Sequence, residues 1–443
     1  MKNTEMITQF SGMRYGALER VLTLSRLLNQ LGQPDHAFKI IHICGTNGKG
    51  STGTVIARLL QAQGYRVGLF TSPYIMCVEE SIQINQQPIS SAQFNQTLNG
   101  VQQALKVLGI MPKTTVSYFE MLVLVALVYF QQQAVDYLIL ECGLGGQLDA
   151  TNAIDQAAYT IFTKISLDHT AILGKTIQAI ATTKSKIIRP KTPVVIAPHQ
   201  DAVAQAVLTA EAHRKNAPLL AANLNWIKAN QPTASGQKVT LKLPDCPEFS
   251  VEFSLAGHYQ LENLATALVW YQRFCEDQRR PIDRQVVQTA LAAVHLPGRF
   301  EQLHTAPVVI ADGAHNPDGI QQLVASVKER YPRQSFVIVT GFLKDKDVQT
   351  CLKYLTTLPA QFIVTEPVNP DRRALSANTL QRLLQTITTQ SVTTQVSIKE
   401  ALLTAQQIAL TRQSKPIILV VGSFYLLKTV RQYYQTMEET DEN

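Results

Sequence analysis

A glycine-rich stretch, GTNGKGS at residues 45–51, directly follows an apolar run. We call it the cradle, because backbone N–H groups of such a turn, at the positive end of a following helix, suit phosphate oxygens. Lys49 adds a charge for the outer phosphates, and Ser51 or Thr52 offers a hydroxyl to Mg²⁺ and would begin the helix as its N-cap. The usual P-loop has a further glycine where this chain has Ile43. The stretch predicts a nucleotide site, with an ordinary capped turn as the alternative.

A carboxylate ends a second apolar run, in LILECGLGGQLDATN at residues 138–152. Ligands of α/β sheets bind beyond the carboxyl ends of the strands, so we expect Glu141 to face the same space as the cradle. A carboxylate there suits Mg²⁺, which binds oxygen ligands and phosphate oxygens together. Gly143, Gly145 and Gly146 imply a close approach of the backbone to a ligand and weaken the alternative of a surface carboxylate. Asp149, in the same stretch, has a purely structural alternative, because its side chain can cap its own turn.

Helices and continuous apolar strands alternate around these stretches, which is typical of a parallel sheet covered on both faces. The apolar spacing predicts helices over 18–31, 51–64 and 119–132 and strands over 39–44, 65–73 and 135–142. Alternating polar and apolar residues over 237–255 predict an antiparallel pair on the flank of this first domain.

Proline and glycine stand side by side in HLPGRFE at residues 295–301, and a new series of strands and helices follows. We therefore place a domain boundary there, giving domains 1–296 and 297–443. The expected fold class is α/β. It has an N-terminal P-loop-type, mostly parallel sheet domain with a flanking antiparallel hairpin, and a smaller C-terminal α/β domain, Rossmann-like. Residues 437–443 read as a frayed acidic tail.

Composition excludes several other classes of protein. The chain has 443 residues, 45% hydrophobic and 16% charged, with a net charge of +7 and no dense run of Lys or Arg, which argues against nucleic acid as a partner. Six scattered cysteines without a CxxC pair argue against a disulfide framework and a zinc site, and favour a cytoplasmic location. The beginning lacks the apolar core of a signal peptide. The most apolar segment, 119–130, is too short to span a membrane.

Seven stretches, in order and spacing, resemble the folylpolyglutamate synthase and dihydrofolate synthase family of the Mur ligase superfamily. They are GTNGKGS, TSP, ECGLGGQLDATN, DHTAILGKTIQAIA, LPGRFE, DGAHNP and VVGSFYL. The resemblance covers nearly the whole chain, and the family's cradle omits the early glycine.

The resemblance implies an ATP-dependent amide ligase with an ATP-binding central domain and a C-terminal glutamate-ligase domain. ATP would phosphorylate a folate carboxylate, and the amine of L-glutamate would attack the acyl phosphate. The implied cofactors are ATP and Mg²⁺, the partners are small-molecule substrates, and the enzyme is expected to be a monomer.

Site residues follow from the resemblance position by position. The ATP contacts would be Thr46, Asn47, Gly48, Lys49, Gly50, Ser51, Asn263, Arg299 and Asp312. The magnesium ligands would be Ser51, Ser72, Glu141 and His169, and the catalytic residues Lys49, Lys184 and His315. The folate side would involve Tyr74, Glu80 and Ser81.

Two places depart from the family's pattern. Lys184 aligns with a lysine that the family carbamylates, but Thr183, Ser185 and Lys186 replace the usual neighbours, so a solvated basic helix face is the alternative. Ser81 stands where the family has an arginine, which puts the choice of substrate in question more than the reaction.

Other functions stay open at this point. Dihydrofolate synthase, alone or combined, is the nearest alternative, and a cell-wall Mur ligase is disfavoured by the folate-type stretches. A non-catalytic paralogue that binds nucleotide or folate is the alternative from another class. A GTPase or kinase switch would need a guanine-specificity motif, such as NKxD, which does not accompany the cradle.

Overall fold

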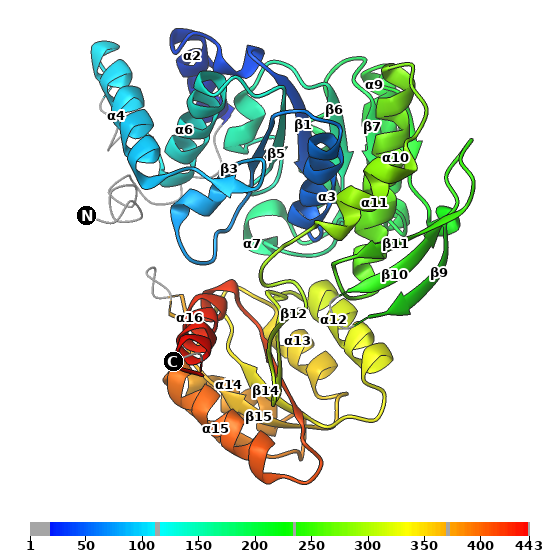
Figure 1. Ribbon diagram of the computed structural model, residues 1–443. Coiled ribbons are helices and arrows are strands. Elements are labelled where there is room, and N and C mark those ends of the chain that lie inside the picture. Colours follow the sequence, from blue (N-terminus) through cyan, green and yellow to red (C-terminus); the bar gives the residue numbers. More distant parts are fainter. Residues whose placement is uncertain (1–17, 111–115, 234–235, 369–372, 442–443) are drawn as a thin grey trace.

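The structure is a computed structural model that describes residues 18–110, 116–233, 236–368 and 373–441. Figure 1 shows two α/β units, one above the other, each built on its own sheet. The chain passes from the upper unit to the lower through residues 293–300, between α11 (Arg284–Ala292) and β12 (Glu301–Thr305). The sequence-based boundary after residue 296 falls in this connection and stays a prediction.

The N-terminal sheet has eight strands within the described residues, in the order β4-β3-β2-β5-β1-β6-β7-β8. They are β1 Lys39–Cys44, β2 Val67–Phe70, β3 Ile82–Ile84, β4 Gln87–Pro88, β5 Tyr137–Glu141, β6 Tyr159–Phe162, β7 Val194–Ile196 and β8 Leu219–Ala221. All neighbours are parallel except β2–β3 and β3–β4. Ile43 of β1 pairs with Glu141 of β5, so the cradle and the carboxylate leave the sheet side by side.

Alternate side chains of β1 enter two different cores, as a strand buried on both faces requires. Ile41 and Ile43 pack among α3 (Lys49–Ala62), α10 (Tyr259–Asp277) and α11, whereas Ile40 packs among α2 (Leu18–Gln30), α4 (Ser91–Val107) and α6 (Tyr118–Gln132). A third core lies beside β6 and β7. The other α-helices among the described residues of this domain are α7 Thr170–Leu173, α8 Ile177–Ser185 and α9 Ala202–Arg214.

The antiparallel element on the flank is larger than predicted. β10 (Gln237–Leu241) and β11 (Phe249–Phe253) form the expected pair, and β9 (Ile227–Pro232) adds a third strand to the other edge of β10. The sequence of β9, IKANQP, has no alternation of polar and apolar residues and ends in proline, so it did not predict a strand.

The C-terminal sheet has six strands within the described residues, in the order β12-β13-β17-β14-β15-β16, and only β12 is antiparallel. Its other strands are β13 Val308–Ala311, β14 Phe336–Thr340, β15 Ala360–Val364, β16 Val392–Thr394 and β17 Ile417–Val421. Helices α12 (Pro317–Arg330), α13 (Val348–Leu355) and α14 (Ala377–Gln385) cover one face, and α15 (Ile398–Thr411) and α16 (Phe424–Asp441) cover the other. The predicted α/β fold with two sheet domains is confirmed.

The acidic C-terminal stretch is helical, contrary to expectation. α16 continues to Asp441, so the predicted frayed tail from residue 437 is wrong for the part that the structure describes. Tyr434 is buried in the core that α15 and α16 share, and this packing anchors the helix through its last turns. No helix in the described residues is both long and apolar enough to cross a membrane.

Candidate active site

The cradle turns at the carboxyl end of β1 and leads straight into α3. Gly48 has a φ of 89° and is the N-cap residue, and α3 begins at Lys49. Ser51 is therefore not the N-cap that the sequence predicted: it lies inside the first turn and is buried. Only glycine fits position 48 without strain, and a Cβ there would also collide with the carboxamide of Asn263. Asn263 thus stands against the cradle, as the prediction of an ATP contact requires.

Lys49 and Glu141 meet at the open end of the cradle. Lys49 Nζ lies 3.7 Å from Glu141 Oε1, and the Lys49 ammonium also donates to the carbonyl of Thr46 at 3.3 Å. Glu141 is only 4% exposed, and its Oε2 has no hydrogen-bond partner among the described residues. Burial raises the pKa of Glu141 to about 7, against the opposing effects of Lys49, Arg299 and the backbone N–H of Ser72.

This environment suits a divalent cation. A buried carboxylate oxygen without a partner is costly, and a bound Mg²⁺ would satisfy it. The hydroxyl of Thr52 is likewise buried without a partner among the described residues, and Ser51 lies next to it at the start of α3. The available donors are oxygens, which is the ligand type that Mg²⁺ prefers.

His169 occupies the loop after β6, just before α7. It has a φ of 50°, in the left-handed region, and its backbone N–H donates to Asp168 Oδ1 at 2.8 Å. Burial lowers the pKa of His169 to about 4, so the imidazole is neutral at neutral pH, which is the form that ligates metals. Its role as a magnesium ligand stays a prediction.

Lys184 lies behind the cradle, on α8. It is 4% exposed, and its Nζ donates to the carbonyl of Gly45 at 2.8 Å. Burial lowers the pKa of Lys184. Lys186 points to another place, since its Nζ lies 3.1 Å from Glu211 on α9, which explains why a lysine is tolerated there. Lys184 is therefore not part of a solvated basic face.

Gly143 and Gly146 approach other parts of the protein, which corrects the expectation of a ligand at these two positions. A Cβ at Gly143 would collide with the ring of Phe119, and one at Gly146 would lie 2.7 Å from the backbone of Lys184. Asp149 caps the short helix that follows it, through the backbone N–H of Thr151 at 2.9 Å.

Three of the predicted site residues, Arg299, Asp312 and His315, belong to the C-terminal domain. The guanidinium of Arg299 lies over the ring of Phe424 at 4.4 Å, near enough to Glu141 to lower its pKa. His315 Nδ1 lies 2.8 Å from the carbonyl of Gly313. Asp312 is buried, and its oxygens accept hydrogen bonds within its surroundings, which favours a structural role over the predicted ATP contact.

The hydrogen bonds of Asp312 tie the connection between the domains to the C-terminal sheet. Asp312 Oδ2 accepts the N–H of Phe300 at 2.7 Å and the hydroxyl of Tyr259 at 2.9 Å, and Oδ1 accepts the N–H of Ala314 at 2.7 Å. Burial raises the pKa of Asp312.

A polar network that the sequence did not reveal joins the two domains at the cradle. Asn47 and Asn316 exchange amide hydrogen bonds of 3.1 and 3.0 Å. Asn47 Nδ2 also donates to Asp318 at 2.7 Å, and Lys164 Nζ lies 2.8 Å from the same carboxylate. Asn316 and Asp318 stand at the beginning of α12, whose N-cap is Asn316.

Asp168 extends this network. Its Oδ1 lies 2.7 Å from Lys346 Nζ, and its Oδ2 accepts the amide of Asn316 at 3.0 Å and faces His315 Nε2 at 3.6 Å. Burial favours the neutral acid, but His315, Lys346 and His169 outweigh it and hold the pKa of Asp168 well below its usual range. We refer to Asn47, Lys164, Asp168, Asn316, Asp318 and Lys346 as the interdomain network. Asn316 and Lys346 lie in DGAHNP and LKDKD, yet neither stretch indicates a partner in the other domain.

The loop after Ser72 is built differently from the cradle. The carboxylate of Glu80 accepts backbone N–H groups of its own loop, from Ile75 at 2.9 Å, Met76 at 3.0 Å and Cys77 at 3.3 Å. Ser81 is 1% exposed. These contacts favour a structural role for Glu80 and Ser81 over the predicted contact with folate.

Tyr74 lies at the other side of the same loop. It is half-buried beside Tyr118 of α6, and burial, together with Tyr74 and Tyr425 of α16, raises the pKa of Tyr118. Tyr74 thus stays the predicted folate-side residue with a partly exposed ring.

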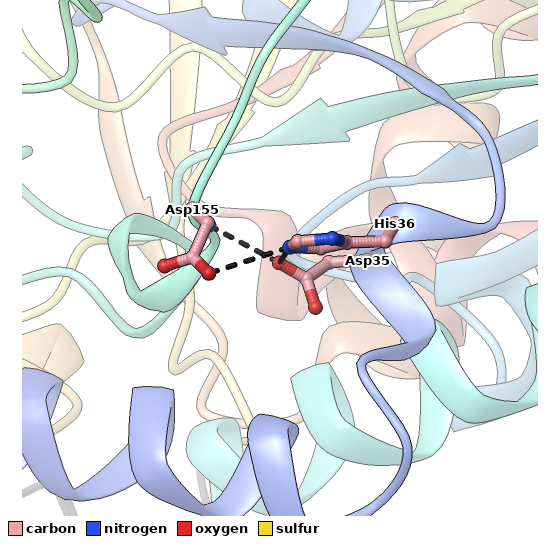
Figure 2. Close-up of side chains that lie close together, drawn as sticks. All are labelled: Asp35, His36 and Asp155. Carbon is pink, nitrogen blue, oxygen red and sulfur yellow. Dashed lines mark hydrogen bonds and ion pairs between the residues drawn. The ribbon is translucent and has the colours of Figure 1, made fainter.

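A separate cluster of titratable groups lies at the amino ends of strands β1 and β6, opposite to the cradle. Figure 2 shows His36 between two carboxylates, with its Nε2 3.3 Å from Asp155 and 3.9 Å from Asp35. His36 precedes β1, whereas the cradle follows it, so the cluster is remote from the cradle. Asp35 Oδ2 accepts the backbone N–H of Asp155 at 3.1 Å, which is a structural bond.

Comparisons with known proteins agree with this geometry. The Mur ligase middle domain pattern matches residues 43–271, and the Mur ligase glutamate ligase domain pattern matches residues 298–424. The folylpolyglutamate synthase of Lacticaseibacillus casei is 33% identical over 430 residues, or 94% of each chain. A dihydrofolate synthase/folylpolyglutamate synthase of Bacillus subtilis is 32% identical over 78% of this chain and 80% of its own.

Solved structures agree over almost the full length. A Mycobacterium tuberculosis folylpolyglutamate synthase complexed with ADP and AMPPCP has a TM-score of 0.87 at 30% identity and covers 95% of this chain and 96% of its own. An FPGS–AMPPCP–folate complex has a TM-score of 0.83 at 32% identity and covers 98% and 99%. Fold and cradle define a ligase of the Mur type. Within that class, the chain belongs to the folylpolyglutamate synthase and dihydrofolate synthase family.

Proposed function

We propose that the protein is a folylpolyglutamate synthase, which adds L-glutamate to the γ-carboxylate of a tetrahydrofolyl-(poly)glutamate with ATP. A folate carboxylate oxygen attacks the γ-phosphorus, ADP leaves, and an acyl phosphate forms. The nitrogen of glutamate then attacks the acyl carbon, phosphate leaves with the bonding electron pair, and the nitrogen loses a proton. The observation that carries the proposal is the buried Glu141 beside Lys49 at the end of the cradle, with one oxygen that has no hydrogen-bond partner among the described residues.

The residues fit the demands of this chemistry. An anionic carboxylate and an anionic phosphate repel each other, so positive charge must lie where they meet. Lys49 supplies that charge from the N-terminal domain and Arg299 from the C-terminal one. Mg²⁺ held by Glu141 would neutralise charge on the phosphates, with His169 and the hydroxyls of Ser51 and Ser72 as its other proposed ligands. His315 is proposed to lie beside the incoming glutamate.

Closed domains protect the acyl phosphate from water, which would otherwise hydrolyse it. The interdomain network runs along the cradle, where Asn47 is bound to Asn316 and Asp318 of the other domain.

The cradle and its opposing residues come from one chain, so we also propose that the enzyme acts as a monomer. Light scattering would test this by giving the mass of one 49.1 kDa chain.

A carbamate on Lys184 is a further part of the proposal. Burial favours the neutral amine, which is the form that reacts with CO₂, and a carbamate would exchange a buried cation for an anionic metal ligand. Carbon-13 NMR under labelled CO₂ should show a carbamate signal that is lost in Lys184→Arg. An unchanged signal in this variant would contradict the assignment.

The deciding experiment is phosphate release with ATP and glutamate, comparing dihydropteroate, dihydrofolate and methylene-tetrahydrofolate. The proposal expects release that depends on both glutamate and a reduced folate. Release with dihydropteroate as well would show the combined activity that the name of the Bacillus subtilis relative describes. ATP binding with no glutamate-dependent release would favour the non-catalytic alternative.

A further inference from the structure

The carboxylate of Asp168 joins groups of both domains, and the reaction proposed above assigns it no task. We propose that Asp168 is a positioning residue: paired with Lys346, it holds the two domains together and fixes His169 and His315 beside the cradle, so that both histidines come into place together. This inference rests on the proposed function for the meaning of the two histidines. Its geometry is independent of that function.

On the N-terminal side, Asp168 belongs to a loop that is tied to the cradle. Thr46 Oγ1 donates to the carbonyl of Ser166 at 3.0 Å and accepts its N–H at 3.1 Å. Asp168 Oδ1 accepts the N–H of His169 at 2.8 Å, and His169 has the left-handed φ of 50°. A non-glycine residue keeps that conformation only where its surroundings determine it. The carboxylate of Asp168 is one of the groups that determine it here.

On the C-terminal side, the same carboxylate holds three side chains. Lys346 Nζ is 2.7 Å from Oδ1, while Asn316 Nδ2 at 3.0 Å and His315 Nε2 at 3.6 Å face Oδ2. His315 Nδ1 lies 2.8 Å from the carbonyl of Gly313, within hydrogen-bond distance, while Nε2 faces Asp168 at the longer distance of an ion pair. The orientation of the ring is thereby set by Asp168 on one side and by its own domain on the other.

The burial of the pair argues against a passive contact. The side chains of Asp168 and Lys346 are 9% and 6% exposed. Apolar residues would join two domains at a lower desolvation cost than a buried ion pair, so an ion pair at this place indicates a need for orientation. The neighbouring pair of Asp345 and Arg373 provides the contrast, since it lies within one domain, at 3.6 Å, and is 37% and 33% exposed.

The kinetic test uses Asp168→Asn, Lys346→Met and the double variant, with Asp345→Asn and Lys353→Met as matched controls. We expect kcat of glutamate-dependent phosphate release to fall about 10- to 100-fold in each single variant, because a small misplacement of reacting groups costs that much. KM for ATP should stay within about twofold, because the cradle is unchanged, while KM for glutamate should rise. The double variant should be no slower than the slower single variant, since paired residues are not additive.

A second measurement does not depend on turnover. Small-angle scattering with Mg²⁺ and AMPPCP should give a larger radius of gyration for Asp168→Asn and Lys346→Met than for the wild type and the controls. If the wild type turns over no folate, the proposed function fails, and scattering alone decides whether the pair closes the domains.

Three outcomes would overturn the inference. The first is a lower melting temperature of Asp168→Asn with wild-type kcat and wild-type radius, which would mark a role in stability alone. The second is independent, multiplicative losses in the double variant. The third is an unchanged radius in both single variants. Should Asp168→Asn fail to fold, Lys346→Met carries the same test.

Discussion

Two glutamates of the N-terminal domain were both predicted to belong to the site, and the structure separates them. Glu80 has its carboxylate surrounded by backbone N–H groups of its own loop. Glu141 is buried. Its Oε1 lies 3.7 Å from Lys49 Nζ, and its Oε2 has no hydrogen-bond partner in the described part of the chain.

The difference shows how a structural carboxylate can be told from a reactive one. A carboxylate whose oxygens already accept hydrogen bonds has little left to offer a ligand. A buried carboxylate with an oxygen that has no hydrogen-bond partner lowers the stability of the fold. Such a cost is expected where a metal or substrate completes the site. Spacing in the sequence cannot separate the two cases, because it does not say which N–H groups surround each side chain.

The largest expected effect concerns the lysine beside Glu141. Lys49→Ala removes the charge at the outer phosphates and should lower kcat by about 10²–10³-fold, in a phosphate-release assay. Lys186→Ala is the matched control, because Lys186 pairs with Glu211 on a half-exposed face at 3.1 Å. An equal loss of kcat in Lys49→Ala and Lys186→Ala would show that the lysine of the cradle has no special role in the reaction.

The comparison itself is tested by Glu141→Gln against Glu80→Gln. Glu141→Gln should lower kcat by about 10²-fold with folding intact, because a neutral amide binds Mg²⁺ poorly. Glu80→Gln should instead lower the free energy of unfolding by about 1–3 kcal/mol, since an amide nitrogen cannot accept the N–H groups of the loop. Denaturant unfolding and steady-state kinetics on both variants give the answer. A catalytic loss in Glu80→Gln at unchanged stability would restore Glu80 as a functional residue.

A smaller effect is expected for pH. Burial raises the pKa of Glu141 to about 7 without metal, so below that pH a proton competes with the cation for the carboxylate. The apparent affinity for Mn²⁺, used as a probe for Mg²⁺ in the presence of AMPPCP, should fall by up to about tenfold per pH unit below 7 and level off above it. Glu141→Gln should retain only the pH dependence of the nucleotide. An identical profile in wild type and variant would exclude Glu141 as a metal ligand.

The smallest effect is expected at Ser81. Its hydroxyl is buried with no partner among the described residues, so Ser81→Ala removes a group that makes no hydrogen bond. Stability should be unchanged or slightly higher, and KM for folate should stay within about twofold. A large rise in KM for folate would show that the serine contacts substrate after all.

The cradle and the sheet beneath it could be predicted from the sequence, because each depends on neighbours in the chain. An apolar run before a glycine-rich turn places Lys49 and Glu141 at one edge of a sheet, whatever happens elsewhere. The start of α3 was predicted wrongly. Gly48, with its positive φ, is the N-cap residue, so the helix begins at Lys49 and not at Ser51.

The interdomain network could not be predicted, because its partners are far apart in the chain. Asp168 and Lys346 lie 178 positions apart in the chain, and the pair exists only when the two domains lie together. Nothing in a run of residues such as LKDKD says that one lysine faces a carboxylate of the other domain. The continuation of α16 to Asp441 was not predicted for a similar reason, because Tyr434 packs in a core between the C-terminal sheet and the helices α15 and α16.

The paired amides of Asn47 and Asn316 have a consequence for how this sequence can change over time. Each amide donates to and accepts from the other, across 269 residues of chain. A substitution at one position alone would leave a donor and an acceptor of the other unmatched, whereas a joint change to another complementary pair would not. We therefore expect the two positions to drift together among relatives, so that covariation between them would record the closed state in sequence data alone.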